Sequence, residues 1–266
     1  DVNLHAKQED VLIDTITVGT EHNDIRITAD LGNIEEMVPG DADDSFDDPA
    51  TAGLDLIADH AVLTANGSIG GLLPLETRLN SLEAHAGTTG DIDLNEHDAI
   101  TLTDVDTNDG SITFDAGGSI TALDVESATD HDDNDITLHN TGGDILLDRV
   151  DAGTSQGDVH LTSDSGSVRE MENQDAGIDL VADHAVINAN GGIGGGSPLE
   201  TELNSIEAHA GTTGDIDLNE HDAITLTDVD TNDGSITFDA GGSITALDVE
   251  SATDHDDNDI TLHNTS

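Results

Sequence analysis

Isoleucine and leucine alternate with polar residues in short runs along most of this chain. Ile92 and Leu94 are separated by one polar residue, and the same spacing recurs at 112–114 and 136–138. A period of two residues is typical of a β-strand with one buried face. Glycine clusters between the runs, as at 142–143, and favours tight turns there. The pattern therefore predicts many short strands joined by turns.

The runs belong to a long internal repeat. Residues 83–141 recur without a change as residues 207–265, and the flanking sequences recur with substitutions. We divide the chain into a first copy, 1–134, with an insertion near 41–50, a second copy, 135–258, and the start of a third, 259–266. A tandem repeat of this kind predicts an extended architecture in which each unit contacts only its neighbours.

A finer period of about 20 residues separates equivalent strands within each copy. Strands this short do not bury a face alone, but successive coils that stack in register enclose a narrow aliphatic core. We therefore predict an all-β protein, a parallel β-helix (β-solenoid) of about 12 coils. Residues 75–86 alternate poorly, and either a helical turn or an irregular coil is expected there.

The composition leaves two other folds open. A tandem array of β-sandwich domains also fits the strand spacing, but three Phe and no Trp or Tyr leave such domains without their usual buried aromatics. Disorder is the second alternative, because an apolar content of 34% with a net charge of −54 is typical of unfolded chains. The regular alternation of apolar and polar residues argues against disorder.

The charge limits the partners. Fifty-nine acidic residues oppose five basic ones, so nucleic acid and anionic membrane surfaces are excluded as electrostatic partners. Carboxylates at this density repel one another unless salt screens them or divalent cations neutralise them. The chain has no cysteine and therefore no disulfide.

Several segments resemble the coils of filamentous haemagglutinin-like exoproteins. The segments are 90–94 (GDIDL), 110–113 (GSIT), 118–121 (GSIT), 189–194 (ANGGIG) and 199–208 (LETELNSIEA). These giant bacterial surface or secreted proteins have right-handed β-helical shafts. The resemblance implies a rigid shaft, right-handed coils, an extracellular or cell-surface location and often a role in adhesion. The secretion module of that family is not found in this sequence.

Acidic turns are the candidate metal sites. Calcium binds six to eight oxygen ligands, and alternating Asp and Asn side chains in a turn supply several of them. The turn at 104–110 has this pattern, but Asp109 stands at the sixth position, where an EF-hand loop has glycine, and Gly110 follows one residue later. A solvated turn without a metal ion is therefore the alternative. We expect calcium at these residues, their copies and a second acidic turn: Asp104, Asp106, Asn108, Asp109, Asp228, Asp230, Asn232, Asp233, Asp130, Asp132, Asp133 and Asp135.

Histidine does not occur at the compact spacing that transition-metal sites need, so none is expected from the sequence. Polysaccharide-acting enzymes do exist on β-helices, yet sugar-binding aromatics are missing here and an identical repeat suits a unique active site poorly. We therefore expect no enzymatic activity. The leading hypothesis is a structural extracellular shaft that assembles end to end with copies of itself or forms part of a giant adhesin. The alternatives are a calcium-dependent binding module and a polysaccharide-acting enzyme.

Overall fold

The computed structural model describes residues 1–37, 53–71, 73–171, 177–253, 255 and 258–265. The predicted insertion at 41–50 lies outside this part of the chain. The described residues of the first copy form β1 (Val2–Ala6), β2 (Val11–Ile13), β3 (Ile16–Ala29), β4 (Ile34–Glu36), β5 (Leu56–Ala65), β6 (Leu75–Arg78), β7 (Ser81–Ala86), β8 (Ile92–Glu96), β9 (Ile100–Thr107), β10 (Ile112–Ala116), β11 (Ile120–Ala122) and β12 (Val125–Ser127).

The second copy and the start of the third continue the series. Their strands are β13 (Ile136–Asn140), β14 (Ile145–Leu147), β15 (Val150–Asp151), β16 (Asp158–Ser163), β17 (Val168–Glu170), β18 (Leu180–Ala189), β19 (Leu199–Ala210), β20 (Ile216–Glu220), β21 (Ile224–Thr231), β22 (Ile236–Ala240), β23 (Ile244–Ala246), β24 (Val249–Ser251) and β25 (Ile260–Asn264). No described residue is helical. The helical alternative for 75–86 is therefore wrong, because β6 and β7 occupy that segment.

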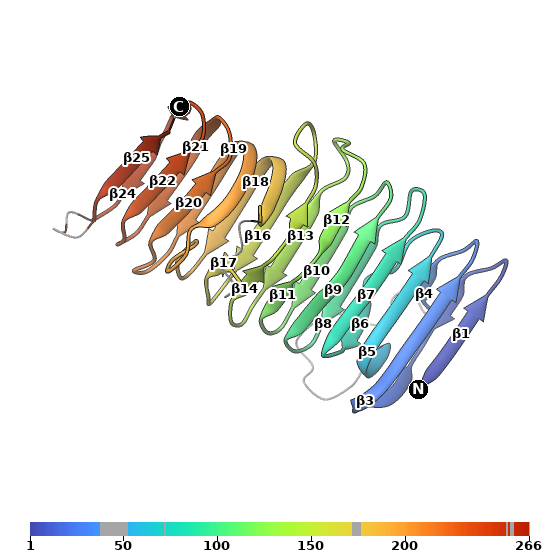
Figure 1. Cartoon of the computed structure of the whole chain (residues 1–266). Coiled ribbons are helices and arrows are strands. Elements are labelled where there is room, and N and C mark those ends of the chain that lie inside the picture. Colours follow the sequence, from blue (N-terminus) through green and yellow to red (C-terminus); the bar gives the residue numbers. More distant parts are fainter. Residues whose placement is uncertain (38–52, 72, 172–176, 254, 256–257, 266) are drawn as a thin grey trace.

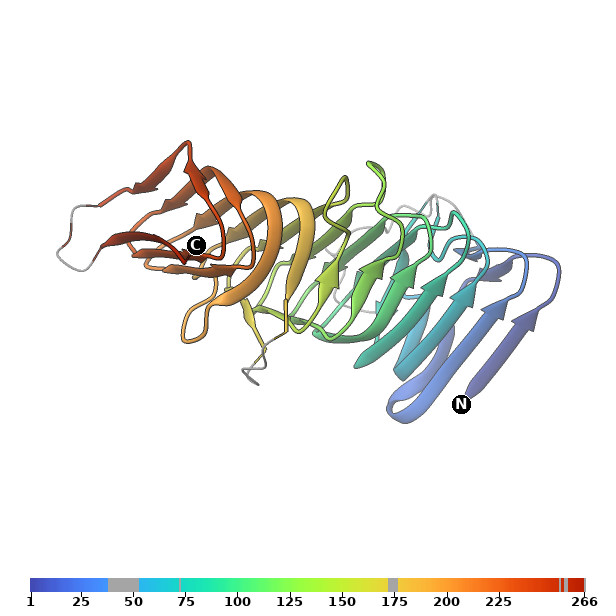
Figure 2. The same ribbon diagram turned by 45° about the horizontal axis from the view of Figure 1, so that its top comes forward.

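The strands stack into an elongated β-solenoid in which neighbouring strands are parallel (Figures 1 and 2). The predicted fold class is confirmed. The solenoid has about 11 turns, close to the 12 predicted. The difference arises because several turns are longer than 20 residues: Ile92 pairs with Ile112, but Ile112 pairs with Ile136 and Val159 pairs with Ala185.

Each turn contributes three strand segments to three faces. In one turn these segments begin at Ile92, Ile100 and Val105, and each pairs with the segment 20 residues further along the chain. Strand β9 carries two of the segments, because its burial alternation is interrupted at Thr103 and Asp104, which both point outward. The faces together enclose the core.

The two copies do not place equivalent residues on the same face. One column of paired residues consists of Ile92, Ile112, Ile136, Val159, Ala185 and Ile206. Ile216 is the counterpart of Ile92, yet its column consists of Ile100, Ile120, Ile145, Val168, Ile193 and Ile216. One copy therefore occupies five turns and part of a sixth, and the second copy is rotated by one face. The pairing crosses the boundary at 134/135 without interruption.

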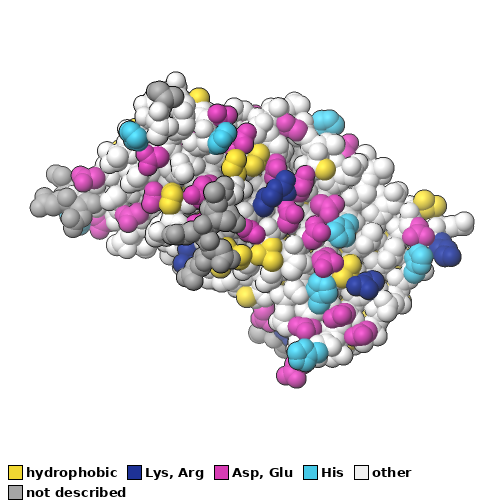
Figure 3. All heavy atoms as spheres, viewed as in Figure 1, with side chains coloured by type: hydrophobic (Ala, Val, Ile, Leu, Met, Phe, Trp, Pro, Cys, Tyr) yellow, Lys and Arg dark blue, Asp and Glu magenta, His cyan; other side chains and the backbone are white. Residues whose placement is uncertain are grey.

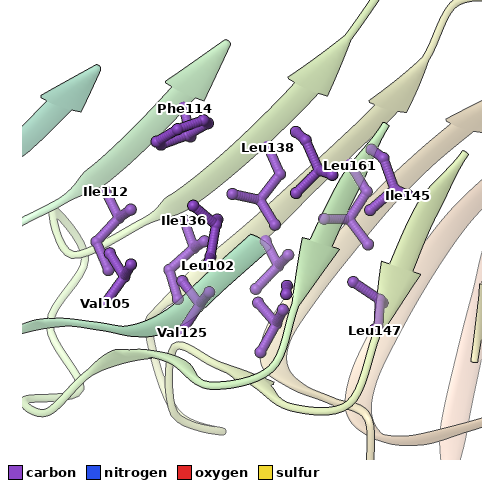
Figure 4. Close-up of a cluster of buried hydrophobic side chains, with 14 of the residues drawn as sticks. Leu102, Val105, Ile112, Phe114, Val125, Ile136, Leu138, Ile145, Leu147 and Leu161 are labelled. Carbon is purple, nitrogen blue, oxygen red and sulfur yellow. The ribbon is translucent and has the colours of Figure 1, made fainter. Parts of the chain in front are cut away.

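Aliphatic side chains fill the interior from one turn to the next. Phe114, Leu138 and Leu161 follow one another on successive strands, and none is exposed to solvent (Figure 4). Burying a Leu or Phe side chain contributes about 1.5–3 kcal/mol before conformational entropy is counted. The stacked aliphatic columns explain why the fold needs so few aromatic residues.

Glycine allows the corners to stack closely. A Cβ atom at Gly90 would collide with the backbone of Gly67 in the preceding turn, and one at Gly110 would collide with Gly90. The three glycines form a column with no room for a side chain. This close backbone approach explains why the turns of successive coils share glycine at the same place.

Candidate functional site

On the face drawn in Figure 3, acidic side chains are more numerous than basic ones, and the basic side chains lie among them. Arg149 donates hydrogen bonds to Asp124 at 2.7 Å, Glu126 at 2.9 Å and Asp151 at 2.8 Å. Strand β12, which carries Glu126, and strand β15, which carries Asp151, belong to successive turns. The guanidinium therefore ties neighbouring turns together and relieves the repulsion between their carboxylates.

Two of the predicted calcium ligands meet a histidine from the neighbouring turn. Asp104 and Asp106 on β9 lie beside His85 on β7, and one ligand atom of each side chain lies within 4.8 Å of the others. The ring of His85 is hydrogen-bonded to Asp106, and this bond raises the pKa of His85. The second copy repeats the group with His209, Asp228 and Asp230.

The other half of the predicted calcium turn is directed elsewhere. Asp109 accepts hydrogen bonds from Thr129 Oγ1 at 2.7 Å, Asn134 Nδ2 at 3.0 Å and His131 Nδ1 at 2.9 Å. The bonds from Asn134 and Thr129 lower the pKa of Asp109. Asn108 is exposed and donates its backbone N–H to the carbonyl oxygen of Ala86 in the preceding turn. Asn108 and Asp109 therefore do not join Asp104 and Asp106, and Asn232 and Asp233 repeat this arrangement.

The second predicted acidic turn is not one site either. Asp130 accepts the backbone N–H groups of Ser155 at 2.9 Å and Gln156 at 2.7 Å, so it holds the following loop. Asp135 accepts the backbone N–H of Asp158 at 3.0 Å. Asp132 and Asp133 are exposed. Among the described residues, none of these four carboxylates belongs to a group compact enough to share a cation.

A different pair of acidic clusters was missed by the sequence analysis. Glu36, Asp55 and Glu76 place one carboxylate oxygen each within 4.8 Å of the others, and Glu170, Asp179 and Glu200 repeat the arrangement in the second copy. Asp55 and Asp179 are each only 2% exposed. The three acids come from separate turns. Comparing only the acidic positions of the two copies could have identified these clusters, because all three positions are acidic in both copies although the surrounding sequence differs.

Burial sets the protonation of these clusters. It raises the pKa of Asp55 to about 8, and the charges of Glu76 and Glu36 add to the increase while the backbone N–H of Glu76 opposes it. Burial likewise raises the pKa of Asp179 to about 8. Ionising all three neighbouring carboxylates is unfavourable in free energy unless a positive charge lies between them. The clusters therefore suit either a shared proton or an oxygen-coordinated cation such as calcium.

Glu96 is a buried carboxylate with a structural role. It accepts hydrogen bonds from Thr77 Oγ1 at 2.8 Å, from the backbone N–H of Leu79 at 2.9 Å and from that of Asp98 at 3.0 Å. These donors lie in two neighbouring turns, so Glu96 closes a corner of the solenoid. Glu220 is its counterpart in the second copy and accepts the bond from Thr201 at 2.8 Å.

A comparison of the chain with protein-family models, with curated proteins and with solved structures finds no match. Among the described residues, no helix is long and apolar enough to cross a membrane. The geometry of the chain itself is therefore the basis for a functional interpretation.

Proposed function

We propose that the protein is a structural shaft, an acidic β-solenoid that builds an extended extracellular fibre or part of a giant surface adhesin. The observation that carries the proposal is the continuous parallel pairing through both copies of the repeat. A stack of this kind grows by addition of further turns of the same kind. The resemblance of its coils to haemagglutinin-like exoproteins supports an extracellular or cell-surface location.

The two end turns each present an edge that another turn can cover. Leu4 in β1 is 39% exposed and Leu12 in β2 is 55% exposed. At the other end, Ile260 is 45% exposed and Leu262 is 39% exposed. An exposed β-edge with apolar side chains favours pairing with another strand. The partner would be a further turn of the same polypeptide or the end of another molecule, and repeated end-to-end contact gives an open filament.

The ends are also compatible in sequence. Strand β1 occupies the position in the repeat that β13 and β25 occupy. In the middle of the solenoid β13 lies between β10 and β16, whereas β25 is paired with β22 alone among the described strands. A turn placed on β25 would therefore meet the same surface that β16 meets on β13.

Electron microscopy of the purified protein, with and without a calcium chelator, tests the shaft. Thin fibres of uniform width are the expected result. A chain extended by a further 124-residue copy should give particles that are longer by a constant increment and unchanged in width. Compact particles whose width grows with chain length would contradict a shaft.

Calcium binding is a second candidate function, favoured by the duplicated clusters around Asp55 and Asp179. Isothermal titration of calcium in high salt should show two saturable sites. The variant Asp55→Asn should remove one of them, and Asp55→Asn with Asp179→Asn should remove both. Asp132→Asn is the matched control, because Asp132 is exposed and lies in neither cluster. Equal calcium uptake by all variants would show that calcium only screens the surface.

A further inference from the structure

The groups around His85 and His209 each combine a nitrogen ligand with two carboxylates, and both copies of the repeat contain them. A third histidine-containing group, Glu202, His221 and Asp222, has no counterpart in the first copy, because Arg78 stands in place of Glu202. His85 lies with Asp104 and Asp106, and His209 lies with Asp228 and Asp230. In both groups one ligand atom from each residue lies within 4.8 Å of the other two. The histidines are half-buried, with 31% of each side chain exposed, so the groups are reachable from solvent.

Stacking and a local irregularity of the backbone create these groups. His85 on β7 pairs in register with Asp106 on β9. The register of this pair shifts between Leu82 and Glu83, because Leu82 pairs with Leu102 whereas Glu83 pairs with Asp104. Asp104 therefore points outward, as Asp106 does. Such a bulge redirects a side chain without ending the strand. The chain spacing of histidines could not reveal the groups, because their carboxylates belong to the following turn.

We propose that these two groups are a duplicated pair of binding sites for a divalent transition metal such as Zn²⁺ or Co²⁺. Imidazole nitrogen and carboxylate oxygen bind Zn²⁺ at about 2.0–2.2 Å, and ligand atoms this close together can reach one ion. Calcium prefers six to eight oxygens, so a set with one nitrogen and two carboxylates favours the transition metal. Three protein ligands leave a coordination position open.

A groove beside the second site provides space for that open position. The groove has a volume of about 470 Å³, and its wall includes His209, Asp230, Asn188 and Asn232. These polar side chains come from three successive turns. A metal ion held by His209 and its two carboxylates would face the groove, where water or an anionic ligand could complete its coordination.

The two sites have identical ligands but different surroundings. Asp124 contributes negative charge near Asp104, and Arg149 is paired with Asp124 at 2.7 Å. Among the described residues, Asp248, the counterpart of Asp124, has no ion pair with an arginine or lysine. The site of His209 therefore lies in a more negative field, and we expect it to bind the metal more tightly.

Titration with Co²⁺ alone, in molar sodium chloride to screen diffuse binding, tests the proposal through its d–d absorption bands. Two ions per chain are expected. His85→Gln and His209→Gln should each weaken one site at least about tenfold, and the double variant should remove both. The control is His139→Gln, whose imidazole contacts Asp115 and Asp164 in a similar half-buried setting but belongs to neither group. Far-UV circular dichroism verifies that each variant remains folded.

Arg149→Gln provides a second measurement that does not alter a ligand. It should strengthen Co²⁺ binding at the His85 site by about two- to fivefold and leave the His209 site unchanged. Zn²⁺ should displace Co²⁺ from both sites, whereas calcium at the same concentration should not. Full Co²⁺ uptake by the double histidine variant would overturn the proposal, as would equal losses in His139→Gln or displacement by equimolar calcium.

Discussion

Strands β11–β13 and strands β23–β25 have the same sequence but different surroundings. Leu138 and Ile136 are fully buried, whereas their counterparts Leu262 and Ile260 are 39% and 45% exposed. Strand β13 is paired on both sides, with β10 and β16. Strand β25 is paired with β22, and no described strand covers its other edge. The comparison shows that the burial of a strand in this molecule comes from the next turn, not from its own sequence.

The largest expected difference between the two regions comes from a core truncation. Leu138→Ala should lower the free energy of unfolding by about 2–5 kcal/mol, because it leaves a cavity between stacked turns. Leu262→Ala should cost less than about 1 kcal/mol, because its side chain is already exposed. Urea denaturation measures both costs, and hydrogen exchange shows which turns open. Equal costs would mean that both strands are equally covered in solution.

A further turn should remove this difference. Adding residues 142–170 after Thr265 would place a counterpart of β16 on β25. Leu262→Ala in the extended protein should then approach the cost of Leu138→Ala, and the amide protons of 260–264 should exchange as slowly as those of 136–140. An added segment of the same length and composition in scrambled order is the control. Slow exchange with the scrambled segment would show that specific stacking is not the cause.

The buried glutamates should differ in their response to pH. Burial raises the pKa of Glu96 to about 7, from an ordinary value of 4.5. The folded state therefore favours the protonated form, and the stability that Glu96 contributes is complete below about pH 4.5 and is lost as the pH rises to about 7. Glu96→Gln should remove this part of the pH dependence, on the order of 1–3 kcal/mol.

Glu220→Gln is the matched variant in the second copy. Burial also raises the pKa of Glu220, and its turn lies nearer the exposed end. We expect a change in the same direction and of smaller size. Denaturation at a series of pH values between 4 and 8 measures both variants. A stability that rises with pH more steeply in the unaltered protein than in Glu96→Gln would contradict the assignment.

The smallest expected effect concerns Arg149. Its ion pairs are partly exposed, so Arg149→Gln should cost at most about 1 kcal/mol, and less in high salt. The loss should appear in the turns of β12 and β15, with no effect on β24, the counterpart of β12. Local hydrogen exchange is the suitable measurement. A uniform loss of protection along the solenoid would mean that the arginine acts through the total charge instead.

The sequence predicts the fold because one local rule is repeated many times. Alternation around Ile92 and Ile112 identifies the strands and the core, and the glycines identify the corners. The sites are harder to predict. Asp104 and Asp109 lie five residues apart but on different sides of a corner, while Asp55 meets acids from other turns. The lengths of the turns decide which residues of neighbouring turns lie side by side. Small differences in these lengths accumulate along the chain.

The rotation between copies decides which side of the solenoid the equivalent residues of each copy face. Because one copy occupies five turns and part of a sixth, identical residues in successive copies point in different directions around the axis. In a longer array, a given residue would follow a spiral and return to the same side only at every third copy. A flat partner, such as a cell wall or a mineral surface, would then touch one copy in three, while partners approaching from all sides would find the sites equally available.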